Sequence, residues 1–391
     1  MKIYRYKMYD KAKRGRLDKT ITRFGYVRNY AVKMTEYYYK YFGKSLSAYQ
    51  LSNHIAKKKR RNCATGRLVA GLDAQAVQEC LGRVYKGFKA YFAACKKKRS
   101  DKEVENKRVR KPHERKPWKN RSFTLLQCGY KFDEEKNRVR IGGVWYGFFK
   151  SQELKGKVKR ITIKRDWCGD MWLVVLTDRN EPVEGSRTGE AAGFDFGLKT
   201  FLTGSDGYDI LSPQFLERNM KKLAKLQKHL SQAQKGSKHR RRARLAVAKM
   251  HRRIENCRND WQWKVALELV RRYDAIFLET LSIAGMQRHK NWGRKVSDLA
   301  YSSFLSKLES LAMKRGKLVV YIDRWMPTSQ ICHKCGEKAS LTKDLKIREW
   351  DCPHCGAHHD RDRNAAINIL RVGMSTLGRD SVRRLSAREV A

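Results

Sequence analysis

The spacing of hydrophobic residues changes along the first half of the chain. Between residues 26 and 98 apolar positions recur every three or four residues, as in YVRNYAVKMTEYYYKYF, which is typical of amphipathic helices. From residue 122 to residue 178 the pattern is alternating and rich in β-branched residues, as in RITIKRDWCGDMWLVVLTD, which predicts strands. Cys168, Gly169 and Asp170 are expected to turn a hairpin there. We therefore predict a helical lobe and a small β domain, for which a barrel is one possible form.

After residue 190 the order of the predicted elements is informative. The stretch AAGFDFGLKTFLTGSDGYDIL predicts three strands joined by glycine-containing turns. A basic helical stretch follows from about residue 213 to residue 272, broken near KGSKHR; then come a strand in DAIFLETL, a helix in YSSFLSKLESLAMKRGK, a strand in LVVYIDRW and a last helix. This is the ribonuclease H-like order of elements. The whole pattern predicts an α+β multidomain protein.

The charge of the chain restricts its partners. Its 391 residues include 88 Lys and Arg against 39 Asp and Glu, a net charge of +49, and the basic residues occur along the whole length. Such a chain repels itself unless a polyanion neutralises it, and the distribution favours nucleic acid. From the runs KKKRR and KHRRRAR we expect contacts by six residues: Lys57, Lys58, Arg60, Arg61, Arg240 and Arg241.

No apolar run approaches the length of a membrane span, and the N-terminus lacks the hydrophobic segment of a signal peptide. We therefore expect no membrane partner. The expected location is the cytoplasm of a prokaryotic-type cell, in association with the nucleoid. The sequence leaves the oligomeric state open.

Two cysteine pairs predict a metal site. Cys332 and Cys335 form one pair, and Cys352 and Cys355 form the other, with sixteen residues between the pairs. This spacing is typical of a zinc ribbon, in which four thiolates surround one structural Zn²⁺ ion. Four histidines lie close enough to compete as ligands, but we favour the thiolates; they are His333, His354, His358 and His359.

Three acids occupy three elements of the ribonuclease H-like region. Asp195 is on the first strand, Glu279 ends the strand in DAIFLETL, and Asp362 begins the last helix in HDRDRNAAINIL. Each alone is more often a solvated residue, but together in this order they predict a catalytic centre. Three adjacent carboxylates need cations among them, and two Mg²⁺ ions would activate a water and stabilise the leaving oxygen of a phosphodiester. Asp360 is the rival of Asp362; we favour Asp362 because it lies closer to the packed helical turns, with Asp360 as a cap or a supporting group.

These motifs carry a resemblance. GFDFGLKTFLT, IFLETL, TSQICHKCG and CPHCGAHHDRDRNAAINIL resemble the RuvC-like core and zinc ribbon of TnpB proteins, transposon-encoded relatives of type V CRISPR effectors. The resemblance covers residues 190 to 372 with several specific motifs and is looser before them. It implies an RNA-guided DNA endonuclease, whose guide RNA derives from the transposon end and pairs with double-stranded target DNA beside a short motif. It also implies catalytic, Mg²⁺-binding roles for Asp195, Glu279 and Asp362, and Zn²⁺-binding roles for the four cysteines.

The resemblance also implies a division into domains. We expect a wedge β-barrel domain in residues 1–25 and 119–182, with a helical recognition lobe in residues 26–118. A RuvC-like nuclease domain would take residues 190–329 and 359–372, a target-binding zinc ribbon residues 330–358, and a flexible tail residues 373–391. Gln75 and Thr124 lie in stretches that resemble those reading the target-adjacent motif, and a Gln can pair with adenine in the major groove.

Two other functions remain open at this stage. The protein could be an RNA-guided repressor that binds DNA without cutting it, but the three acids are all present. It could also be a nuclease that recognises branched or hybrid structures without a guide. The large basic regions ahead of the ribonuclease H-like core favour a long RNA partner over that alternative.

Overall fold

The chain divides into two compact units. A computed structural model describes residues 1–10, 12–61, 63–100, 109–179, 185–288, 292–339, 344 and 347–387, without the side chains of 96–100 and 378–387. The first unit is Met1–Glu181 and the second is Pro182–Ala391. Part of the predicted basic stretch at residues 101–120 and part of the linker at residues 180–193 lie outside the described residues.

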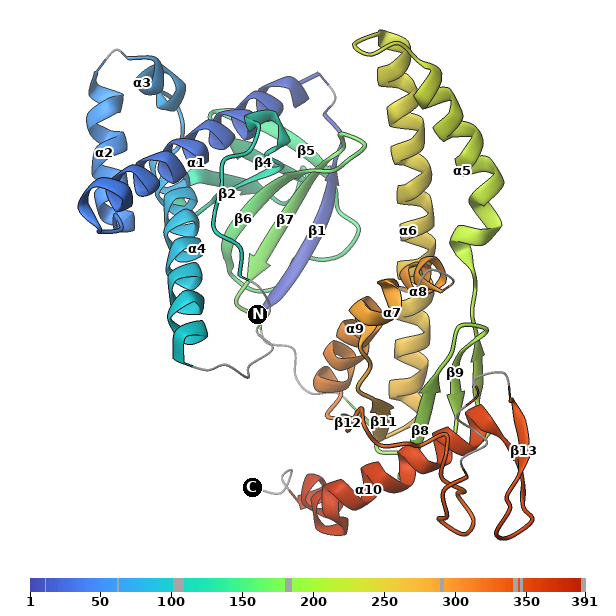
Figure 1. Ribbon diagram of the computed structural model, residues 1–391. Coiled ribbons are helices and arrows are strands. Elements are labelled where there is room, and N and C mark those ends of the chain that lie inside the picture. Colours follow the sequence, from blue (N-terminus) through green and yellow to red (C-terminus); the bar gives the residue numbers. More distant parts are fainter. Residues whose placement is uncertain are drawn as a thin grey trace. The chain divides into compact units, whose positions relative to one another are not determined.

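Within its described residues, the first unit contains a seven-stranded sheet in the order β2-β6-β7-β1-β5-β4-β3. Its strands are β1 (Lys2–Met8), β2 (Ser122–Leu125), β3 (Tyr130–Asp133), β4 (Arg138–Ile141), β5 (Val144–Phe149), β6 (Val158–Arg165) and β7 (Met171–Thr177). The predicted hairpin joins β6 to β7, and Gly169 supplies the positive φ of +82° that the turn needs. The sheet curves into a nearly closed barrel (Figure 1), which agrees with the form considered from the sequence.

The helices of the first unit share a hydrophobic core with this sheet. They are α1 (Arg14–Phe42), α2 (Ala48–Arg60), α3 (Ala64–Val69) and α4 (Ala74–Ser100), with short 3-10 turns at Pro117–Lys119 and Gln127–Gly129. Phe24 of α1 stacks on Phe123 of β2 at 5.2 Å between ring centroids. The boundary expected between residues 25 and 26 falls inside α1, because this helix begins at Arg14 and packs on the sheet along its first turns.

The second unit has the strand order that the sequence predicts. Over the described residues its main sheet runs β10-β9-β8-β11-β12. Its strands are β8 (Ala191–Phe196), β9 (Thr200–Gly204), β10 (Asp209–Leu211), β11 (Ala275–Glu279) and β12 (Leu318–Ile322). The first three form an antiparallel meander, whereas β11 and β12 run parallel to β8. This is the ribonuclease H-like order.

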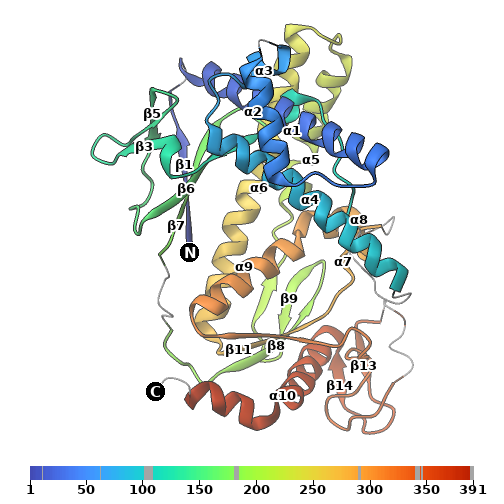
Figure 2. The ribbon, with the colours of Figure 1, turned by 90° about the vertical axis from the view of Figure 1, so that its left-hand side faces the viewer.

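Helices cover both faces of this sheet (Figures 1 and 2). The helices of this unit are α5 (Phe215–Gln232), α6 (Lys238–Arg272), α7 (Ile283–Arg288), α8 (Gly293–Leu299), α9 (Tyr301–Lys314) and α10 (Arg361–Ala387). Of these, α6 and α9 pack on one face of the sheet and α10 packs on the other. Side chains alternate along β11: Ile276 and Leu278 join the core formed with α6 and α9, whereas Ala275 and Phe277 face α10. A strand buried on both faces explains the uninterrupted apolar run that precedes Glu279.

The break predicted near KGSKHR separates α5 from α6, and the two helices form an antiparallel hairpin between β10 and β11. A small apolar seam of Leu223, Met250 and Ile254 holds it together. None of the helices described here is long and apolar enough to cross a membrane.

The last helix differs from the expectation for the C-terminus. Residues 373–391 were expected to form a flexible tail, but α10 continues through this boundary to Ala387. Val372, Met374 and Leu377 provide the reason, because they pack against the sheet beside Ile369. Residues 388–391 lie outside the described residues.

Candidate functional site

Two of the predicted acids project from the same face of the sheet. On β8, Asp195 follows Gly193 by two positions, and on β11, Glu279 follows Phe277 by two, so both acids face α10. The parallel register pairs Phe277 with Gly193 and Leu278 with Phe194. The next position on each strand is Glu279 and Asp195, which places the two acids on neighbouring strands at the same level.

The third acid, Asp362, lies in the first turn of α10, above that face of the sheet. Burial raises the pKa of Asp195 well above its usual range, and the charges of Glu279 and Asp362 raise it further. Burial also raises the pKa of Glu279, against the opposing effect of a hydrogen bond from Thr328. The structure therefore brings the three acids within electrostatic reach of one another, in an arrangement that a bound cation would stabilise.

The charged residues around Asp362 have separate partners. Asp360 accepts a hydrogen bond from the backbone N–H of Arg363 at 2.7 Å, which is the geometry of a helix cap. Arg361 donates to the carbonyl of Asp344, and Arg363 donates to the Asp209 carboxylate. The charge of Asp362 helps to raise the pKa of Asp195. The geometry thus favours Asp362 as the third member of the group.

Asp362 also has a basic partner. Nη1 of Arg348 donates to both of its carboxylate oxygens, at 3.0 and 3.3 Å. Among the residues that the structure describes, the acids form a more open group than the cysteines, which alone have ligand atoms all within 4.8 Å of one another.

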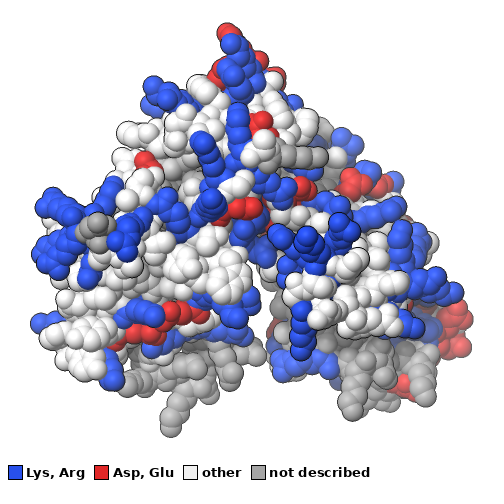
Figure 3. Space-filling model, turned by 90° about the horizontal axis from the view of Figure 1, so that it is seen from above, with Lys and Arg blue, Asp and Glu red and all other residues white. Residues whose placement is uncertain are grey.

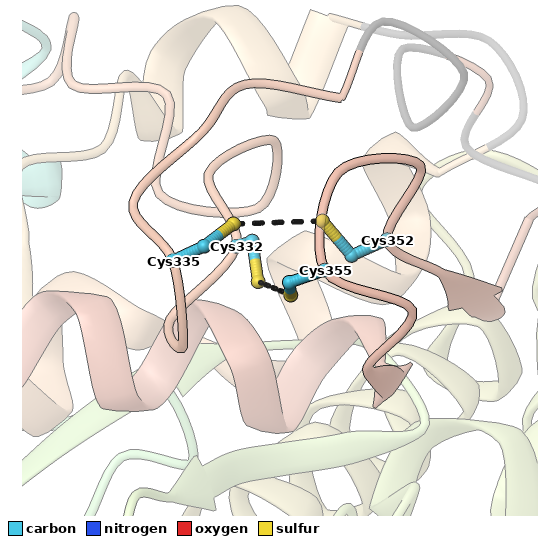
Figure 4. Close-up of side chains that lie close together, drawn as sticks. All are labelled: Cys332, Cys335, Cys352 and Cys355. Atoms are coloured by element: carbon cyan, nitrogen blue, oxygen red, sulfur yellow. Dashed lines mark hydrogen bonds between the residues drawn. The ribbon is translucent and has the colours of Figure 1, made fainter.

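The four cysteines come from two matching loops (Figure 4). The sulfurs of Cys332 and Cys355 are 3.7 Å apart, and those of Cys335 and Cys352 are 3.6 Å apart. In each loop the first cysteine donates its N–H, at 2.9 Å, to the carbonyl of the residue five positions later. Positive φ values at Gly336 and Gly356 allow both turns. The cluster can hold one metal ion with four sulfur ligands.

The neighbouring histidines have other roles in this geometry. His359 lies in β14 (His358–Asp360), which pairs with β13 (Glu349–Asp351). It is buried beside Trp350, and its Nε2 lies 3.0 Å from the sulfur of Cys332. His333 is held by Asn364, and His358 by Asp351, while His354 is exposed. The arrangement agrees with the preference for a four-thiolate site.

The residues predicted to contact nucleic acid lie in different surroundings. Lys57, Arg60 and Arg61 are exposed and Lys58 is partly exposed, at the C-terminal end of α2. Gln75, in the first turn of α4, is partly buried, and its Oε1 has no hydrogen-bond partner among the described residues. The contacts of these residues with nucleic acid remain predictions.

Two of the residues predicted to contact nucleic acid also make hydrogen bonds within the protein. Thr124 is only 4% exposed, and its hydroxyl lies 3.0 Å from that of Thr162 on the next strand, so it offers little surface. Arg240 donates to the carbonyls of Leu230 and Ala233 at 2.8 Å, which closes the α5–α6 hairpin. Arg241 is exposed. Both residues thus make internal hydrogen bonds, and their contacts with nucleic acid remain predictions.

Three neutral residues near the acids were not predicted. Thr328 donates to Glu279, and Asn364 and Asn368 of α10 donate to backbone carbonyls of the segment leading to Cys332. The signal for the asparagines was present: they are four residues apart in NAAIN, on the buried face of a helix, where amides must find partners. Thr328 carried no comparable signal.

Close packing at Gly193 yields a testable prediction. A Cβ built on Gly193 would lie 2.4 Å from the backbone oxygen of Ala366 and 2.5 Å from the backbone nitrogen of Leu370. We therefore expect Gly193→Ala to push α10 away from β8, to lower the melting temperature by about 5 °C or more, and to weaken any function that needs Asp195 and Asp362 together. Differential scanning calorimetry provides the measurement. Gly82→Ala is the control, because its Cβ would meet nothing within 4 Å; an equal effect of both substitutions would contradict the prediction.

Two acids on neighbouring strands in the middle of the sheet, a third acid on α10 and an adjoining four-cysteine cluster able to hold one metal ion characterise the second unit. Comparisons with known proteins agree. Residues 174–290 match a family model described as a probable transposase, and residues 301–369 match the Cas12f1-like TNB domain. A Streptomyces pristinaespiralis protein named "Putative RNA-guided DNA endonuclease" is 32% identical over 301 residues, covering 76% of this chain and 71% of that protein.

Two further likenesses extend the comparison. TnpB-like protein L770 of Acanthamoeba polyphaga mimivirus is 26% identical over 277 residues, covering 66% of this chain and 52% of that protein. A cryo-EM structure of a Cas12f1–sgRNA–target DNA complex superposes with a TM-score of 0.52 at 15% identity, covering 90% of this chain and 82% of that chain, which shows a shared fold. The chain belongs to the TnpB family of RNA-guided DNA endonucleases.

Proposed function

We propose that this protein is an RNA-guided DNA endonuclease that hydrolyses target DNA at a RuvC-like centre formed by Asp195, Glu279 and Asp362. One observation carries the assignment of the centre: three acids from β8, β11 and α10 converge on one face of the sheet, where the second and third raise the pKa of the first. The partners are a guide RNA derived from the transposon end and double-stranded DNA. Family membership supports both.

The residues of the centre suit divalent cations. All three side chains offer the oxygen ligands that Mg²⁺ prefers, and their mutual repulsion would be relieved by positive charge. Bound Mg²⁺ would activate a water and stabilise the leaving oxygen of the phosphodiester. In this chain the two strands fix Asp195 and Glu279 rigidly, while the start of α10 presents Asp362 where backbone N–H groups favour a carboxylate. Thr328 donates a hydrogen bond to one oxygen of Glu279.

The cysteine cluster is proposed to hold one structural Zn²⁺ ion. Four sulfur ligands leave no position for water, so the ion would stabilise the fold and take no part in hydrolysis. The carbonyl oxygens of the two loops already pair with backbone N–H groups in equivalent ways, and this leaves the thiolates directed at the ion. The division into wedge, recognition lobe, nuclease domain and zinc ribbon remains a proposal, apart from the boundaries inside α1 and α10 described above.

The α5–α6 hairpin is proposed to contact the phosphate backbone of the guide RNA. No Asp or Glu occurs between Glu217 and Glu255, whereas Lys or Arg recurs throughout this stretch. Lys221, Lys225 and Lys228 recur every three or four residues on α5 and are exposed, away from buried Leu223. Seen from above in Figure 3, the surface carries many more Lys and Arg than Asp and Glu.

The hairpin contact predicts a change in salt dependence. We expect Lys225→Gln with Lys228→Gln to reduce the slope of log affinity for guide RNA against log salt by about 1.5, because each lost phosphate contact removes about 0.7 to 0.9. The control replaces Lys150 and Lys159 by Gln, since both lie outside the hairpin and already pair with acids, Glu153 and Asp178. Filter binding across salt concentrations measures both slopes. Equal slopes for the two double variants would exclude the hairpin as a phosphate-binding surface.

The proposed function is tested by expressing the chain with its native flanking DNA and sequencing the RNA that copurifies. A discrete RNA with a constant scaffold and a segment matching flanking DNA is the expected result. The purified complex should then cut a DNA that matches this segment in the presence of Mg²⁺. A heterogeneous mixture of cellular RNA, with no cutting of the matched DNA, would contradict the proposal.

A further inference from the structure

We propose that Thr328 is a positioning residue of the nuclease centre. The inference rests on the proposed function and deepens it. The Thr328 hydroxyl donates a hydrogen bond to Oε1 of Glu279 on β11. The carbonyl of the same residue accepts hydrogen bonds from α10, the helix that carries Asp362. A single residue thus connects two of the three acids.

The connection to α10 is made by two buried amides. Nδ2 of Asn368 donates to the carbonyl of Thr328 at 2.8 Å and to that of Ile331 at 2.6 Å. Nδ2 of Asn364 reaches the same two carbonyls at 3.4 and 2.8 Å. Asn364 and Asn368 are 1% and 3% exposed, and Thr328 is 3% exposed, so water competes little for these bonds.

The hydrogen bonds of Asn364 also reach the cysteine cluster. Oδ1 of Asn364 accepts a hydrogen bond from the backbone N–H of His333 at 3.0 Å. Cys332 lies between His333 and Ile331, so the first metal-binding loop is fixed to α10 by the residues that fix Thr328. The geometry of the cysteine loop and the orientation of Glu279 therefore depend on one set of contacts.

A threonine suits this role chemically. A carboxylate can accept hydrogen bonds or coordinate cations through both oxygens, so a donor at Oε1 leaves Oε2 available as a ligand. The hydroxyl is neutral and does not offset the negative charge that attracts a divalent cation. An arginine or lysine in its place would compete with that cation.

The test compares substitutions of Thr328 in the full-length chain bound to its guide RNA. Thr328→Val keeps the shape and removes the hydroxyl, whereas Thr328→Ser keeps the hydroxyl. We expect Thr328→Val to weaken Mn²⁺ binding, followed by electron paramagnetic resonance without target DNA, by about tenfold or more, as is usual when a residue that orients a metal ligand is lost. The Mg²⁺ concentration for half-maximal cutting should rise by a similar factor, with target-DNA affinity unchanged. Thr328→Ser should restore most of both losses.

Each outcome is decisive. Wild-type Mn²⁺ affinity and Mg²⁺ dependence in Thr328→Val would overturn the positioning role. If that variant unfolds or loses the metal of the cysteine cluster, Thr328→Ala, which removes the hydroxyl without adding a methyl group beside the carboxylate, replaces it. Asp195→Ala separates this proposal from the proposed function. If wild type and Asp195→Ala bind Mn²⁺ equally, the nuclease centre itself is wrong; if only Asp195→Ala loses binding, Thr328 alone is misassigned.

Discussion

Asp362→Asn is expected to lower the rate of target-DNA cutting by about 1,000-fold, whereas Asp360→Asn, two residues away, should leave it within a fewfold of wild type. The substitution at Asp362 keeps the side-chain shape but removes a negative charge that would hold a cation. A loss of about 4 kcal/mol of transition-state stabilisation corresponds to this factor. Asp360 instead caps α10, and Asn is as good a cap as Asp. Single-turnover cleavage of a matched DNA gives both rates.

Each variant carries one Asp→Asn substitution, and the two positions are two residues apart, so each variant serves as the control for the other. Both should retain the copurified RNA and wild-type affinity for target DNA, because neither residue is proposed to bind nucleic acid. Equal losses of cutting would leave the choice between the two acids undecided and contradict the geometry described for α10. A greater loss at Asp360 would assign the third ligand to that residue.

Removal of the metal from the cysteine cluster should have the second large effect. We expect the purified protein to contain about one equivalent of zinc, and Cys352→Ser to lose it. Structural zinc contributes about 10 kcal/mol or more to the folding of small zinc domains, so the loops around the four cysteines should unfold without it. Because Asn364 ties these loops to α10, cutting should be lost as well.

The measurements are zinc content by plasma mass spectrometry and melting temperature by calorimetry. Cys257→Ser is the matched control, since Cys257 is exposed on α6 and belongs to no metal-binding cluster among the described residues. It should keep its zinc and its activity. Zinc retained in Cys352→Ser would indicate that a neighbouring histidine can serve as a ligand. His359 is the candidate for that role, since its Nε2 lies 3.0 Å from the sulfur of Cys332, whereas His333 is held by Asn364.

Much of the second unit could be predicted from the sequence. The apolar run before Glu279 predicted a buried strand, the break at KGSKHR predicted two helices, and the structure confirms both. The cysteine pairs could be recognised because metal ligation requires a short, fixed spacing within each pair. The structure brings their four sulfurs together. The three acids could be selected because each occurs at a defined place in the predicted order of elements: on the first strand, at the end of the fourth strand and at the start of the last helix.

The remaining features depend on contacts that sequence spacing does not specify. The early start of α1 and its shared core with the barrel follow from packing between Phe24 and Phe123, which lie about 100 residues apart in sequence. Thr124 and Arg240 have ordinary polar side chains, and only the structure shows that both make hydrogen bonds within the protein. The helical C-terminus was missed because its apolar residues are sparse and gain a partner only from the sheet.

The direct passage from β14 into α10 sets a limit on the length of this part of the chain. β14 ends at Asp360 and α10 begins at Arg361, so no spacer separates the cysteine loops from the helix that presents Asp362. One inserted residue would turn every later side chain of the helix by about 100° relative to the loops. Asp362 would then face away from Asp195, or the cysteine loops would have to move. Insertions and fused tags therefore belong outside residues 355–370, however well exposed individual positions there are.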